Sequence, residues 1–103
     1  RVIAACTGDL PFPNRRMWDL EAWFPGQDRY RETHSCSNCT DFQTRRLNIQ
    51  VKTKQGNKEV HALNATALTD RVLLAIIENN QLKDGSIEVP EVLQKYVGKK
   101  VIK

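Results

Sequence analysis

Two cysteines in the stretch SCSNCTDFQTRR, residues 35–46, are the first candidates for chemistry. Cys36 and Cys39 have two residues between them, which is the spacing of half a zinc knuckle. The two further ligands of a four-ligand site could come from among His34, His61 and Cys6. A structural zinc site normally has a second pair at comparable spacing, and this chain has none. A redox pair belongs at the start of a helix in a thioredoxin-like unit, and Asp41 and Phe42 give that reading little support. The cysteines alone favour packing as small, half-buried side chains.

Oxygen-bearing side chains lie just before these cysteines. Glu32 and Ser35 offer the carboxylate and hydroxyl oxygens that a hard cation such as Mg²⁺ prefers. A capping or turn arrangement of the same two side chains is the alternative, and the pattern alone favours it.

A second polar set consists of Asn64, Thr66 and Arg71, where a predicted strand meets a predicted helix. A helix N-terminus attracts anions, and an arginine in its first turn could bind a phosphate. The plainer interpretation is a threonine cap with a solvated arginine. Arg45 and Arg46 are most simply a solvated or packed basic pair.

The composition sets limits on the kind of protein. The 103 residues suffice for one domain with a modest core, and the 40% apolar share is ordinary for a globular chain. A net charge of +4 is compatible with a polyanionic partner but is common to many basic proteins. Three cysteines cannot all pair internally, so a reducing compartment fits better than a secreted disulfide framework. No apolar run approaches the ~20 residues of a membrane span. The chain opens inside an apolar run without a Met, so we expect it to be a piece of a longer protein.

Apolar patterning predicts the strands. We expect a buried strand over residues 2–6, a loop at LPFPN, and an aromatic-rich strand over residues 17–24. Alternating apolar residues at 47, 49 and 51 predict a half-exposed strand. A turn at residues 55–57 should lead to an antiparallel return over residues 59–63.

Two helices are expected in the second half of the chain. TDRVLLAIIENN contains six consecutive apolar residues, 72–77, which predict a helix buried on most sides after a cap at Thr69 or Thr66. A short helix should open at Pro90 in PEVLQKYV, and we expect the basic tail GKKVIK to be exposed.

Several separate segments, in the same order, resemble the C-terminal part of the catalytic domain of seryl-tRNA synthetase, a class II aminoacyl-tRNA synthetase. The block YRETHSCSNCTDFQTRR occupies residues 30–46, and the third class II signature occupies residues 63–79. The resemblance covers nearly the whole chain and points to the bacterial or mitochondrial type or to a synthetase-like paralogue. It implies an α+β fold, an antiparallel β-sheet flanked by helices, with residues 1–103 as a single-domain fragment. His34 stands where the family usually has Ser, and the interval from Asn64 to Arg71 is one residue shorter than the family's.

The resemblance also implies an ATP site beside the CSNC stretch, which in this family is not a zinc knuckle. It assigns Glu32 and Ser35 to the Mg²⁺ that bridges the ATP phosphates. Thr33 and His34 belong to the same nucleotide-contacting strand. Arg71 is the implied catalytic arginine, which contacts the ATP phosphates.

The same resemblance implies that Thr66, helped by Asn64, binds the serine substrate. The implied reaction is activation of L-serine by ATP to seryl-adenylate, followed by transfer to tRNA(Ser). Such catalysis consists mostly of positioning and of neutralising phosphate charge. The implied cofactors are ATP and Mg²⁺, and no zinc is expected.

The longer parent protein is expected to supply the remaining functions. We expect L-serine, ATP and tRNA(Ser) as partners of the parent, a homodimer through the N-terminal part of its catalytic domain, and no membrane. The cytoplasm and the mitochondrial matrix fit equally. The 103 residues alone should be inactive, because the α-phosphate arginine and the tRNA-gripping arm lie outside them. The alternatives are a non-catalytic paralogue acting as a binding or scaffold protein and, on charge and cysteines alone, a zinc-dependent nucleic-acid-binding module.

Overall fold

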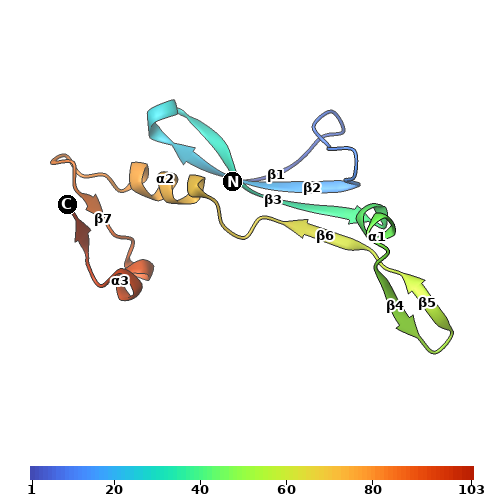
Figure 1. Ribbon diagram of the computed structural model, residues 1–103. Coiled ribbons are helices and arrows are strands. Elements are labelled where there is room, and N and C mark those ends of the chain that lie inside the picture. The colour runs from blue at the N-terminus through green and yellow to red at the C-terminus, as the bar shows by residue number, and fades with distance from the viewer. The chain divides into compact units, whose positions relative to one another are not determined.

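A computed structural model describes all 103 residues of the chain (Figure 1). Its elements, in chain order, are β1 (Val2–Ala4), β2 (Arg16–Phe24), the 3₁₀ helix η1 (Pro25–Gln27), β3 (Arg29–Thr40), α1 (Phe42–Arg46), β4 (Gln50–Thr53), β5 (Gly56–Glu59), β6 (Ala62–Ala65), α2 (Asp70–Asn79), β7 (Ile87–Glu88), α3 (Glu91–Val97) and β8 (Val101–Ile102). The residues form two compact units. The first unit comprises Arg1–Glu21 and His34–Ala67, and the second unit comprises Ala22–Thr33 and Leu68–Lys103. The single domain expected from the length stays a prediction.

A four-stranded sheet in the order β1-β2-β3-β6 is the main β structure. β1 runs antiparallel to β2 with Val2 opposite Leu20, and β6 runs antiparallel to β3 with Asn64 opposite Ser37. β2 confirms the aromatic-rich strand expected over residues 17–24. The expectation of a buried first strand was wrong, because β1 is an edge strand and its Val2 is largely exposed.

The region after β3 differs from the predicted pattern. The strand expected from residue 47 begins only at Gln50, because α1 forms first and Leu47 is its C-cap. Thr44 stabilises this helical turn: its hydroxyl donates to the carbonyls of Asp41 at 3.1 Å and of Val60 at 2.6 Å. The return strand is also earlier than expected, since β5 ends at Glu59 and residues 62–65 pair with β3 instead.

α2 has the expected position but not the expected burial. It spans Asp70–Asn79, and Thr69 is its N-cap residue, as predicted. Only Ala75 of this helix is buried, whereas Leu73 and Leu74 are more than half exposed. The apolar run of residues 72–77 therefore forms a partly exposed apolar surface on α2, which this chain alone does not cover.

The C-terminal segment confirms the helix after Pro90. α3 spans Glu91–Val97 and ends at Gly98, whose φ of 72° is the left-handed conformation that glycine adopts most easily. The basic tail is exposed as expected, but Val101 and Ile102 also form β8, which pairs with β7. None of the helices has the length and apolar character needed to cross a membrane.

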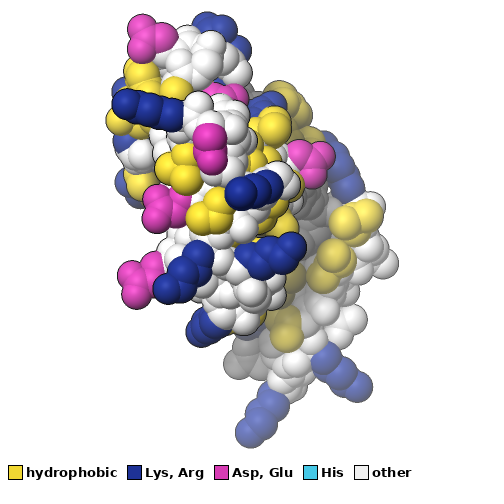
Figure 2. Space-filling model, turned by 90° about the vertical axis from the view of Figure 1, so that its left-hand side faces the viewer, with side chains coloured by type: hydrophobic (Ala, Val, Ile, Leu, Met, Phe, Trp, Pro, Cys, Tyr) yellow, Lys and Arg dark blue, Asp and Glu magenta, His cyan; other side chains and the backbone are white.

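The core of the chain is small. Its buried apolar side chains are Phe24, Cys39, Ala75 and Val89, and its buried polar residues are Thr33, Ser37, Thr44 and Ser86. Figure 2 shows hydrophobic side chains open at the surface among scattered Lys, Arg, Asp and Glu side chains. The expected α+β class, with antiparallel strands and a few helices, is confirmed.

Candidate active site

The residues predicted from the sequence divide between the two units. The first unit contains His34, Ser35, Asn64 and Thr66, and the second unit contains Glu32, Thr33 and Arg71. β3 carries the four consecutive residues from 32 to 35, and α2 carries Arg71 in its first turn.

In the first unit, the residue after β6 lies beside β3. The Thr66 N–H donates to the Ser35 carbonyl at 3.0 Å, and the Ser35 N–H lies 3.5 Å from the Thr66 hydroxyl oxygen. Asn64 is opposite Ser37 and its side chain is exposed. Ser35 and Thr66 are therefore neighbours, and both residues are partly accessible.

In the second unit, the start of α2 is fastened to β3. The Thr69 hydroxyl donates to the carbonyl of the buried Thr33 at 3.0 Å, and Arg71 Nη1 donates to the Glu32 carbonyl at 2.9 Å. The Glu32 carboxylate is exposed and forms no ion pair. A guanidinium has five N–H donors, so Arg71 retains donors for an anion after this one bond.

Thr69 is a residue whose role sequence reasoning missed. Its backbone is extended, with φ −133° and ψ 161°, and its side chain makes no capping hydrogen bond to α2. The hydroxyl bonds to β3 instead, which leaves the first turn of α2 without a side-chain cap. Uncapped N–H groups at a helix N-terminus are suited to an anion.

The cysteines pack rather than gather. Cys39 is 1% exposed and its Sγ lies 3.4 Å from Asn14 Oδ1, while Cys36 is half-buried and Cys6 is exposed. All three are free thiols. No three His, Cys, Asp or Glu side chains come together as a metal-binding group. The packing interpretation of Cys36 and Cys39 agrees with this burial.

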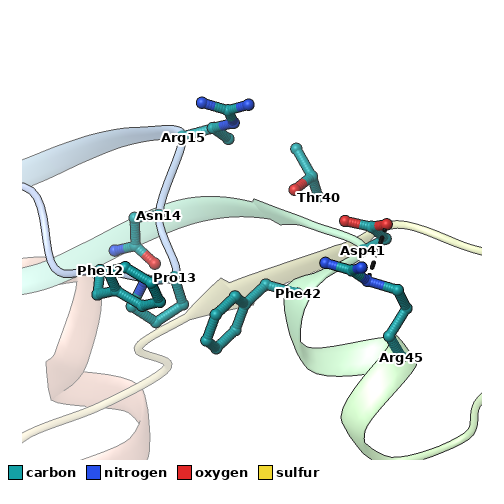
Figure 3. A pocket seen from close by; sticks show the side chains of 8 residues that line it. All are labelled: Phe12, Pro13, Asn14, Arg15, Thr40, Asp41, Phe42 and Arg45. Atoms are coloured by element: carbon teal, nitrogen blue, oxygen red, sulfur yellow. Dashed lines mark ion pairs between the residues drawn. The ribbon is translucent and has the colours of Figure 1, made fainter.

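A pocket of about 320 Å³ in the first unit was not predicted (Figure 3). It lies between the loop before β2 and the segment from the end of β3 into α1. Its lining residues are Phe12, Pro13, Asn14, Arg15, Thr40, Asp41, Phe42 and Arg45. Arg45 Nε pairs with Asp41 Oδ2 at 3.1 Å, as the dashed line in Figure 3 marks. The available sequence signal was a phenylalanine close to an arginine in each segment, Phe12 with Arg15 and Phe42 with Arg45. The pair Arg45 and Arg46 was interpreted only as solvated or packed.

A known family matches most of the chain. Residues 1–80 match the model of the tRNA synthetase class II core domain (G, H, P, S and T). The chain belongs to this family. This synthetase core is 54% identical to the serine–tRNA ligase of Thermodesulfovibrio yellowstonii, in a match covering 100% of the chain and 25% of that relative. It is 50% identical to the serine–tRNA ligase of Pyrococcus abyssi, covering 99% of the chain and 23% of the relative.

Solved structures give the same assignment for this synthetase core. The seryl-tRNA synthetase from Pyrococcus horikoshii complexed with ATP matches with a TM-score of 0.92 and 48% identity, over 99% of the chain and 24% of that structure. The cytoplasmic serine–tRNA ligase from Naegleria fowleri in complex with AMP matches with a TM-score of 0.87 and 48% identity, over 100% of the chain and 26% of that structure. The chain spans about a quarter of the length of these relatives. The resemblance inferred from the sequence is confirmed.

Proposed function

We propose that the chain is part of a serine–tRNA ligase, which activates L-serine with ATP to seryl-adenylate and transfers the seryl group to tRNA(Ser). The observation that carries this proposal is the match of the whole chain, at about half identity, to serine–tRNA ligases. The Pyrococcus horikoshii synthetase, which matches in structure, is complexed with ATP. The accessible polar side chains of β3, β6 and α2 supply the chemistry that the reaction requires.

Arg71 has the role of stabilising phosphate charge. During activation, the serine carboxylate attacks the α-phosphate and pyrophosphate leaves, so a cation near the leaving phosphates lowers the barrier. The bond from Arg71 to the Glu32 carbonyl supports this role. The interval from Asn64 to Arg71 is one residue shorter than the family's, and each residue turns a helix by about 100°. We infer that the loop before α2 absorbs the missing residue, and the bond from Arg71 to the Glu32 carbonyl supports this inference.

Glu32 and Ser35 fit a Mg²⁺ ion by the chemistry of their donors. The side-chain oxygens of both residues make no hydrogen bond or ion pair, and both residues are at least partly accessible. Mg²⁺ usually binds one or two protein ligands together with substrate phosphates and water. When bound, the ion neutralises negative charge on the ATP phosphates. Thr33 and His34 lie between these two residues on the nucleotide-contacting strand.

Thr66 and Asn64 have the role of binding serine. The Thr66 N–H is occupied by Ser35, but its hydroxyl hydrogen remains available for the substrate. When an analogue without the serine hydroxyl binds, the polar group of the site that would bond to this hydroxyl is left without a partner. The site therefore discriminates against such an analogue.

Serine-dependent ATP–pyrophosphate exchange in the full-length protein tests this proposal. Glu32→Ala and Arg71→Ala should each reduce exchange roughly a thousandfold, because each removes a group that balances phosphate charge. Arg29→Ala is the matched control, since Arg29 is an exposed arginine of the same strand, β3, that has no assigned role. It should retain wild-type exchange. A parent without exchange, or one indifferent to both Glu32 and Arg71, favours the non-catalytic paralogue.

The remaining partners follow from the proposed reaction. ATP and tRNA are present both in the cytoplasm and in the mitochondrial matrix, so the proposed reaction fits either compartment. The proposed enzyme is a homodimer through the N-terminal part of its catalytic domain.

A further inference from the structure

The pocket of the first unit has walls that are fixed by hydrogen bonds. On one side, Asn14 Nδ2 donates to the hydroxyl of the buried Ser37 at 2.8 Å, and the Arg15 N–H donates to the Asn38 carbonyl at 2.8 Å. These bonds hold the loop before β2 against β3. On the other side, Thr44 fixes α1 through its two carbonyl partners. The pocket is therefore built by both segments and is not a gap between mobile loops.

The strand that joins the two walls is distorted at the pocket. The pairing of β3 with β6 shifts register between Asn38 and Thr40, and Thr40 has a φ of 47°. A β-branched residue in the left-handed region is strained, and such residues cluster at functional sites. The Thr40 N–H donates to Asn38 Oδ1 at 2.9 Å, which holds this conformation. The distortion lies where the chain passes from β3 towards α1, and Thr40 lines the pocket.

The lining of this pocket includes an aromatic ring and a cation, Phe12 and Arg15. Phe12 is 89% exposed and contacts Phe42 edge to face, with ring centroids 5.4 Å apart. The Arg46 guanidinium covers Phe42 at 3.4 Å from its ring centroid, so Phe12 is the ring that remains open. Arg15 uses only its backbone N–H within the fold, and its guanidinium is unpaired. The Asp41 carboxylate is neutralised by Arg45.

We propose that this pocket binds one unstacked nucleotide of a single-stranded RNA segment, with the base on Phe12 and the adjoining phosphodiester on Arg15. Bases stack on exposed aromatic rings, and guanidinium groups bind phosphates. An acidic peptide fits less well, because the exposed Phe12 ring offers a carboxylate no hydrogen bond, whereas it can stack on a base. The identity of the RNA as a tRNA rests on the proposed function, whereas the binding itself does not.

Fluorescence anisotropy of the full-length protein with a labelled oligouridylate of about 12 nucleotides tests the proposal. Phe12→Leu keeps apolar bulk but removes the aromatic face, and Arg15→Gln removes the cation while keeping the backbone bond. Each should weaken RNA binding about tenfold. Phe12→Trp should bind like wild type. Arg15→Gln should also reduce the slope of log K against log salt by about 0.7, the value for one phosphate contact on a single strand.

Lys52→Gln is the matched control, because it removes one exposed cation of the first unit that does not line the pocket. It should bind RNA within about twofold of wild type, as expected of a charge outside the contact surface. Serine-dependent pyrophosphate exchange requires no RNA and should be unchanged in all four variants, which shows that they fold. A wild-type protein without exchange would remove the proposed function but leave the RNA result to be decided by the same variants.

Three results would overturn the inference. Phe12→Leu and Arg15→Gln could bind RNA like wild type. Lys52→Gln could lose as much affinity as Arg15→Gln, which would indicate general charge attraction. Finally, poly-glutamate could displace the RNA from a protein indifferent to Phe12→Leu, which would indicate a site for acidic peptides.

Discussion

The hydrogen bond from Thr69 to β3 gives a prediction whose size follows from the structure. Thr69→Val removes the hydroxyl but keeps the shape of the side chain, and the extended backbone at this position suits a β-branched residue. The 3.0 Å bond to the Thr33 carbonyl is lost, and Thr33 is buried, so water replaces the donor poorly. Losing a hydrogen bond to a buried residue costs about 1–2 kcal/mol. The opening of the N-terminal turn of α2 should then become roughly five to thirty times more frequent.

Amide hydrogen exchange followed by mass spectrometry measures this opening in the full-length protein. The peptide containing α2 should exchange faster by that factor in Thr69→Val, while Thr69→Ser, which keeps the hydroxyl, should behave like wild type. Because Arg71 lies two residues later, pyrophosphate exchange at low ATP should fall in the valine variant and be spared in the serine variant. Two results would contradict the role of the hydroxyl in fastening α2. The amides of α2 could exchange as slowly in Thr69→Val as in wild type, or Thr69→Ser could speed amide exchange as much as Thr69→Val does.

Three further predictions concern other parts of the chain. The pKa of Asp84 is held below its ordinary value first by the Ser86 hydroxyl at 2.6 Å and then by the Ser86 N–H. A lowered pKa adds stability above the unfolded-state pKa, and this stability is lost as pH falls through the folded-state pKa. Ser86→Ala should therefore raise the Asp84 pKa in a carboxyl NMR titration and reduce stability near neutral pH, and its difference from wild type should shrink in acid. Thr66→Val should weaken the use of serine and spare ATP, measured as separate KM values in pyrophosphate exchange; equal losses for both substrates would contradict its assignment to serine. Metal analysis should find no stoichiometric zinc, and a chelator should leave the far-UV circular dichroism unchanged; one zinc per chain with unfolding on chelation would revive the zinc knuckle.

Sequence patterns placed the elements that bury or alternate apolar residues over several positions. β2, α2 and α3 were predicted with nearly the observed bounds. α1 was not predicted, because its five residues are stabilised by the distant Val60 carbonyl and not by any periodic pattern. The burial of α2 was overestimated, because an apolar run indicates that a surface needs covering but not whether this chain supplies the cover.

The sequence indicated which residues belong to the candidate site but not the hydrogen bonds that hold them in place. Resemblance selected Glu32, Ser35, Thr66 and Arg71, and their roles stay predictions. No spacing rule could have shown that Thr69 bonds to β3 or that Arg71 reaches the Glu32 carbonyl, because these bonds link residues more than thirty positions apart. The left-handed conformation of Thr40, which lines the pocket, could not be predicted either, since threonine rarely adopts that conformation.

ATP–pyrophosphate exchange by the wild-type full-length protein, run separately with each of the common amino acids, tests the assignment to serine–tRNA ligase most directly. We expect exchange with serine, and weak or no exchange with alanine and glycine, which lack the hydroxyl, or with threonine, which carries an extra methyl group. Exchange with a different amino acid would contradict the assignment to serine. The absence of exchange with every amino acid would contradict the enzyme itself and leave a synthetase-like binding protein.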